Sequence, residues 1–133
     1  MQASTQLYEV IYVSTPAPGR PISSVADIAG KARIANPLRG ITGLLIFDGM
    51  RFCHQLEGTQ KQVLNLMEKI RHDPRHINLE IIHHGNLARP RFKSFSLGYT
   101  MVEDPDVLER LEKLDGQAAV SAFLSLLSQV DYV

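Results

Sequence analysis

The sequence has no excess of charge of either sign. Its 133 residues include 14 Lys and Arg and 14 Asp and Glu, so the formal net charge is zero. A nucleic-acid-binding protein presents a basic surface to the phosphates, and a protein drawn to anionic membranes also carries excess basic residues. The balance therefore argues against nucleic acid and membrane as partners.

Cysteine is nearly absent, and long apolar runs are missing. The single cysteine, Cys53, excludes an intrachain disulfide and fits a reducing compartment. No stretch approaches the roughly 18 consecutive apolar residues of a membrane span. The first residues lack both the basic lead and the apolar core of a signal peptide. We therefore expect a cytoplasmic protein, and the length suits one compact domain.

The sequence does contain an ordered series of strand and helix patterns. The strands are expected at 7–14, 40–47, 50–57, 78–85 and 92–101. Capping residues and apolar spacing predict helices from Ser24 to Asn36 and from Thr59 to Asp73, and the proline after each stops it. Asp48-Gly49 between two apolar runs predicts a hairpin with a two-residue type I′ turn.

The order β-α-β-β-α-β followed by one more strand predicts an α+β fold of the ferredoxin-like type. Its two helices cover one face of the sheet, so the other face needs a cover. In the tail, one helix is predicted from Asp104-Pro105 to Gly116, and an apolar helix over 118–130. We expect residues 1–100 to form the ferredoxin-like domain. Residues 101–133 would form a helical extension on the sheet or at a dimer interface.

Patterns for metal binding or catalysis are weak. His72 and His76 have HxxxH spacing, but the proline between them breaks the helix that would align them, so we expect no metal site. Cys53 has no obvious base beside it in the sequence, and we expect no enzyme activity. Arg89-Pro90-Arg91 is expected to form a solvated turn.

One string of motifs is more specific than the order of elements. It runs N-P-x-x-G-I-T-G-L-L, then F-x-x-x-L-E-G, then D-P-R-H, and the strand YEVIYVS precedes it. Over residues 7–100 the chain resembles the BLUF domain, the sensor of blue light using FAD. Its tail resembles the helical extension of the short, single-domain members. The resemblance implies a flavin, FAD or FMN, held edge-on to the sheet between the two long helices.

The resemblance also implies roles for particular side chains. Tyr12 matches the tyrosine that gives an electron and a proton to the excited flavin. The residues implied to contact the flavin are Ser14, Ile28, Asn36, Lys69, Ile70 and Asp73. Taken alone, these residues also fit simpler interpretations: a core tyrosine, an asparagine at a helix end, a surface ion pair and two buried isoleucines. Both interpretations stay open at this level.

The chain departs from the family at the photochemical centre. His54 stands where the family has a glutamine, and Ala35 where it has the first of two asparagines. Phe95 and Leu97, near the flavin on the fifth strand, stand where the family has tryptophan and methionine. Gln55 does not replace the family glutamine, because side chains alternate along a strand and Gln55 is expected to face the tail helices.

His54 changes the expected chemistry. A glutamine amide exchanges its donors and its carbonyl when it rotates, whereas a neutral imidazole has one donor and one acceptor. Unless His54 is an ordinary core histidine, it is expected to take the proton of Tyr12, so that light gives a short-lived tyrosyl radical and no lasting shift.

We therefore predict a flavin-binding blue-light sensory protein with an altered photocycle. It would signal through contacts with a protein partner and form a homo-oligomer. The alternative is a light-insensitive scaffold for protein interaction, with or without flavin.

Overall fold

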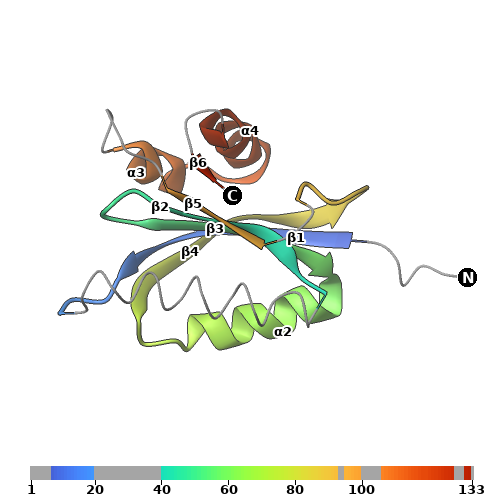
Figure 1. The fold of residues 1–133 in the computed structure, drawn as a ribbon, viewed down its shortest axis with the longest axis horizontal. Coiled ribbons are helices and arrows are strands. Elements are labelled where there is room, and N and C mark those ends of the chain that lie inside the picture. Colours follow the sequence, from blue (N-terminus) through green and yellow to red (C-terminus); the bar gives the residue numbers. More distant parts are fainter. Residues whose placement is uncertain (1–6, 20–39, 93–94, 100–105, 128–130, 133) are drawn as a thin grey trace, which may run out of the picture.

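A mixed β-sheet forms the centre of the molecule (Figure 1). The computed structural model describes residues 7–19, 40–92, 95–99, 106–127 and 131–132. The strands are β1 (Leu7–Pro16), β2 (Thr42–Phe47), β3 (Phe52–Thr59), β4 (His76–Leu87), β5 (Phe95–Tyr99) and β6 (Asp131–Tyr132). They lie in the order β4-β1-β3-β2-β5-β6, and β2 and β5 run parallel. The first four strands have the ferredoxin-like order, so the predicted α+β fold class is confirmed.

Helices lie on both faces of this sheet (Figure 1). α2 (Gln60–Arg71) covers one face, and α3 (Val107–Glu112) and α4 (Gly116–Leu126) cover the other. The predicted cap of α2 is confirmed, because the Thr59 hydroxyl accepts a hydrogen bond from the backbone N–H of Gln62 at 3.2 Å. The helix predicted for 24–36 lies outside the described residues. Within the described ranges, no helix is long and apolar enough to cross a membrane.

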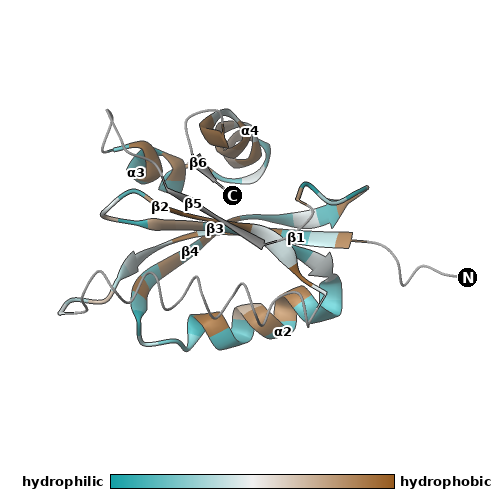
Figure 2. Cartoon of the chain, in the orientation of Figure 1, coloured by the Kyte–Doolittle hydropathy of each residue, from teal (hydrophilic) through white to brown (hydrophobic). Residues whose placement is uncertain are grey.

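Side-chain alternation along the central strands builds an apolar core on each face. The core under the tail helices includes Ile11, Val13, Leu44, Ile46, Cys53, Leu108, Leu111 and Phe123. The core facing α2 includes Tyr8, Val10, Tyr12, Leu56, Val63 and Met67. Figure 2 shows the difference between the covering helices, since α4 is mostly brown and α2 carries both teal and brown bands.

Two predictions for the tail are wrong in detail. α3 ends at Glu112, and Gly116 opens α4 instead of ending the first helix. Gly116 has a φ of +55°, which favours glycine where the chain turns between the helices. After α4, Asp131–Tyr132 pairs with β5 as a short strand that we did not predict. Such a short pairing uses backbone groups alone, so no side-chain pattern predicts it.

The predicted two-residue hairpin turn is also wrong. Phe47 pairs with Phe52, which leaves a loop of four residues between β2 and β3. A carboxylate oxygen of Asp48 accepts hydrogen bonds from the backbone N–H groups of Met50 at 2.9 Å and Arg51 at 2.8 Å. A type I′ turn needs a positive φ at two residues. Because the Asp48 side chain closes this loop instead, only Gly49 in it has a positive φ, at +95°.

Candidate functional site

Tyr12 and His54 form a buried cross-strand pair. They lie directly opposite each other on β1 and β3, and both side chains point to the face that α2 covers. The Tyr12 hydroxyl and His54 Nδ1 are 2.8 Å apart, and the rings meet edge to face with centroids 5.3 Å apart. Each residue is 4% exposed. The two groups that the sequence placed at the photochemical centre are therefore brought together.

Burial sets the protonation of this pair. It lowers the pKa of His54 to about 3, with a smaller contribution from the nearby His76. Burial also raises the pKa of the Tyr12 phenol well above its ordinary value. Both groups are therefore neutral near pH 7, and the phenol can donate to Nδ1 when the imidazole proton is on Nε2. His54 is a weaker base than its ordinary pKa led us to expect.

His76 links the first strand to the end of α2. Its Nε2 lies 2.6 Å from the backbone carbonyl of Ile70, which can only accept, so Nε2 carries a proton. In the neutral ring Nδ1 then accepts from the buried Ser14 hydroxyl at 2.9 Å. The His76 ring also meets Tyr12 edge to face at 6.2 Å. Sequence reasoning considered His76 only as a metal ligand, although it ends the D-P-R-H motif.

The remaining predicted positions lie around this pair at varying distance from it. Ile70 is half-buried at the end of α2, and Lys69 is exposed. The Asp73 carboxylate accepts hydrogen bonds from the Arg75 side chain at 3.0 Å and from its backbone N–H at 2.9 Å, and these bonds lower the pKa of Asp73. The surface ion pair considered for Asp73 is thus made with Arg75 and not with Lys69. Ile28 and Asn36 lie outside the described residues.

Backbone register places the fifth strand in line with the pair. Tyr12 pairs with His54, His54 with Leu45 of β2, and Leu45 with Leu97 of β5. Phe95 pairs with Gly43 in the same parallel ladder. Leu97 therefore belongs to the cross-sheet row of Tyr12 and His54, two strands from His54.

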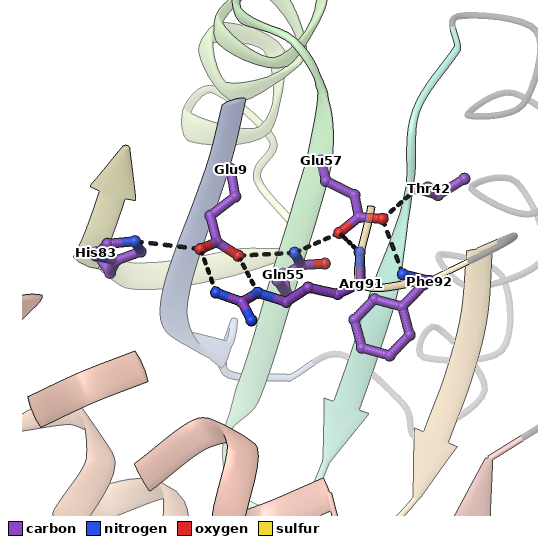
Figure 3. A network of polar contacts seen from close by, with 7 residues as sticks. All are labelled: Glu9, Thr42, Gln55, Glu57, His83, Arg91 and Phe92. Carbon is purple, nitrogen blue, oxygen red and sulfur yellow. Dashed lines mark hydrogen bonds and ion pairs between the residues drawn. The ribbon is translucent and has the colours of Figure 1, made fainter. Parts of the chain in front are cut away.

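Gln55 faces the opposite side of the sheet, as the alternation predicted. Its amide nitrogen donates to Glu9 at 3.0 Å and to Glu57 at 2.9 Å (Figure 3). All three residues are at most 1% exposed. Rotating the amide would aim its oxygen at two carboxylates, so the orientation is fixed. Gln55 cannot perform the amide rearrangement that the family glutamine performs.

Each of the two carboxylates accepts several further hydrogen bonds (Figure 3). Glu57 accepts from the Thr42 hydroxyl at 2.7 Å and from the backbone N–H groups of Arg91 and Phe92 at 2.9 and 3.0 Å. Glu9 accepts two bonds from the Arg91 guanidinium, at 2.8 and 3.0 Å, and lies 3.2 Å from His83 Nε2. Burial alone would raise the pKa of Glu9, but the bonds from Arg91 and Gln55 hold it below its usual value.

The sequence interpretation missed this network. Arg89-Pro90-Arg91 was expected to be a solvated turn, yet the Arg91 side chain is only 25% exposed and binds Glu9 with two parallel bonds. Glu9 stands between Tyr8 and Val10, and Glu57 follows Leu56, on central strands; this is the available signal, because a buried carboxylate needs a partner. Their partner, Arg91, lies far away in the sequence, and no sequence pattern identifies it.

Known proteins resemble this chain in sequence and in structure. The family model described as BLUF, sensors of blue-light using FAD, matches residues 7–98. The blue light- and temperature-regulated antirepressor BluF of Escherichia coli is 33% identical over 73 residues, which cover 55% of this chain and 18% of that protein. The chain thus spans less than a fifth of this curated relative.

Solved structures extend the likeness over nearly the whole chain. The ground state of BlsA superposes with a TM-score of 0.77 at 25% identity, covering 91% of this chain and 87% of that one. Klebsiella pneumoniae BlrP1 with FMN and cyclic diGMP superposes with a TM-score of 0.70 at 28% identity, covering 90% and 34%. The second of these proteins carries a flavin in its structure.

Proposed function

Since the chain belongs to the BLUF family, the sensors of blue light using FAD, we propose that it is itself a flavin-binding blue-light sensory protein whose light reaction leaves no lasting red shift. Flavin, as FAD or FMN, is the cofactor of this family. The observation that carries the proposal is the buried Tyr12–His54 pair, with its hydroxyl 2.8 Å from Nδ1. A phenol held against a base in a dry site is suited to losing an electron and a proton together.

The described half of the site fits a flavin. It offers a phenol, two imidazoles and a hydroxyl on one sheet face, beside the apolar face of α2. Such a set can hydrogen-bond the polar edge of a planar ring while the helix packs on its apolar part. The residues proposed to hold the flavin are Ser14, Ile28, Asn36, Lys69, Ile70 and Asp73, with Phe95 and Leu97 near it on β5.

The light reaction follows from the protonation of the pair. When bound, the excited flavin supplies a one-electron oxidant. Tyr12 loses an electron, and its proton moves to His54 Nδ1. The pKa of His54, about 3, means that the protonated imidazole is disfavoured in the apolar core, so the proton returns quickly. Gln55 is fixed by two carboxylates and provides no amide rearrangement to prolong the change.

Signalling would use surfaces, because we propose no catalytic activity for this chain. The fifth strand and the tail helices are the surfaces proposed to contact a downstream protein partner. We further propose a homo-oligomer in the cytoplasm, with neither nucleic acid nor membrane as partner.

The alternative of a light-insensitive interaction scaffold is favoured by one observation. The base beside Tyr12 is poor and the neighbouring glutamine is fixed, so these two residues provide no lasting change in the hydrogen bonds at the flavin.

The visible absorption spectrum of the purified protein, in the dark and after blue light, tests the proposal. We expect flavin bands that bleach in blue light and show no lasting red shift. A reversible, long-lived red shift would contradict the role given to His54. The absence of flavin, even after it is added, would support the scaffold instead.

A further inference from the structure

A second tyrosine–histidine pair lies on the same face of the sheet as Tyr12 and His54. The Tyr8 hydroxyl is 2.6 Å from His84 Nδ1, and the ring centroids are 6.1 Å apart. Tyr8 and Tyr12 belong to one apolar core. They stand four residues apart on β1, which separates their Cα atoms by roughly 13 Å. The proposed function uses Tyr12 and leaves this second pair unexplained.

The two pairs differ in their access to water. Tyr12 and His54 are each 4% exposed, whereas Tyr8 is 9% exposed and His84 lies at the surface. A proton that moves to His54 creates a cation inside an apolar core, but a proton on His84 is hydrated. A tyrosyl radical whose proton sits on the neighbouring imidazole therefore has a lower free energy at Tyr8 than at Tyr12.

The composition leaves few competing sites for an oxidising equivalent. The sequence has no tryptophan, four tyrosines and one cysteine. Cys53 belongs to the core on the opposite face, and burial raises the pKa of its thiol so that it stays protonated. Among the described side chains, Tyr8 is the second tyrosine on the sheet face that holds Tyr12, and it too has a base at hydrogen-bond distance.

From this geometry we propose that Tyr8 and His84 form a second redox-active pair that receives the oxidising equivalent from Tyr12. One electron moves from Tyr8 to the Tyr12 radical, and the proton on His54 returns to the Tyr12 oxygen. The Tyr8 proton moves to His84 Nδ1. The reactants are the Tyr12 radical, protonated His54, neutral Tyr8 and neutral His84. The products are neutral Tyr12, neutral His54, the Tyr8 radical and protonated His84, so charge and atoms balance.

The inference rests on the proposed function, because the one-electron oxidant of Tyr12 is the photoexcited flavin. Its consequence is a longer-lived oxidised state near the surface of β1 and β4. The transferred proton is then on a group from which water can remove it. The relay would give the chain a lasting light signal that needs no amide rearrangement.

A first experiment tests the pair without flavin. Azidyl radicals generated by pulse radiolysis oxidise tyrosine in the flavin-free protein, and tyrosyl absorption is followed in time. Replacement of the base in His84→Gln should slow formation of the long-lived radical about tenfold or more. Tyr8→Phe should abolish that component. His72→Gln, at another exposed histidine, is the matched control and should change nothing. Equal kinetics in all four proteins would overturn the proposal.

A second experiment tests the relay in flavin-loaded protein by electron paramagnetic resonance after a light pulse. The wild type should show a persistent tyrosyl signal, Tyr8→Phe only a short-lived one, and Tyr12→Phe neither. A persistent signal unchanged in Tyr8→Phe would overturn the relay. A wild type without any tyrosyl signal would contradict the relay and the proposed light reaction together. The first experiment would then still decide whether Tyr8 and His84 are redox-active.

Discussion

His54 provides a pH-dependent contribution to stability that can be isolated by mutation. Its pKa is about 3 in the fold, against about 6.5 in an unfolded chain. As the pH falls, the unfolded state binds the proton first, so the contribution is complete above about pH 6.5 and is lost toward pH 3. The free energy of unfolding should fall by roughly 3 kcal/mol more between about pH 7 and pH 4 in the wild type than in His54→Gln. Urea unfolding at several pH values measures this, and parallel pH profiles would contradict it.

The same position decides which photochemistry the site supports. In His54→Gln, an amide opposite Tyr12 can again exchange donor and acceptor by rotation. We expect the flavin-loaded variant to show a long-lived red-shifted state, which the wild type should lack. The recovery should be partial, because Phe95 and Leu97 also differ from the family pattern. His54→Phe fills the site without a hydrogen-bonding group and should show no such state. A long-lived red shift in both variants would show that the shift does not depend on the amide.

At the scale of elements, one buried cluster ties the central strands to the segment that leads into β5. Glu9 of β1 and Glu57 of β3 bind Arg91 through its side chain and its backbone. In Arg91→Met, Glu9 keeps its buried charge without the guanidinium, which should cost about 3 kcal/mol of unfolding free energy. Arg89→Met removes an exposed arginine two residues away and should cost less than about 0.5 kcal/mol. Denaturant melts of both variants test this, and similar losses would show that the pair with Glu9 is not what stabilises the segment.

The sequence predicted elements better than it predicted contacts between them. Alternation along β3 was enough to assign His54 and Gln55 to opposite faces, because a one-residue slip would have turned every flanking side chain over. Capping chemistry similarly predicted the start of α2. The cluster around Gln55 joins residues 9, 55, 57 and 91, and the bond between His76 and Ser14 spans a similar stretch. In neither case does a local pattern identify the partner, since both depend on how segments that are distant in sequence are brought together.

For the whole molecule, Cys53 is a natural reporter of whether the tail helices stay on the sheet. It is the single cysteine, it is fully buried, and it lies in the same core as Phe123 of α4. Reaction with a thiol reagent therefore requires the tail to open. Phe123→Ala removes a buried ring, which typically costs about 3–5 kcal/mol, and should speed labelling about 100-fold or more.

Leu124 provides the matched control, because it is the next residue of α4 but is 42% exposed. Leu124→Ala should leave the labelling rate of Cys53 nearly unchanged. If this helix face also joins two copies of the chain, as we propose for a homo-oligomer, Leu124→Asp should lower the mass measured by light scattering without exposing Cys53. Fast labelling in the wild type would show that the tail leaves the sheet readily. Equal labelling in Phe123→Ala and the wild type would mean that α4 contributes little to closing that core.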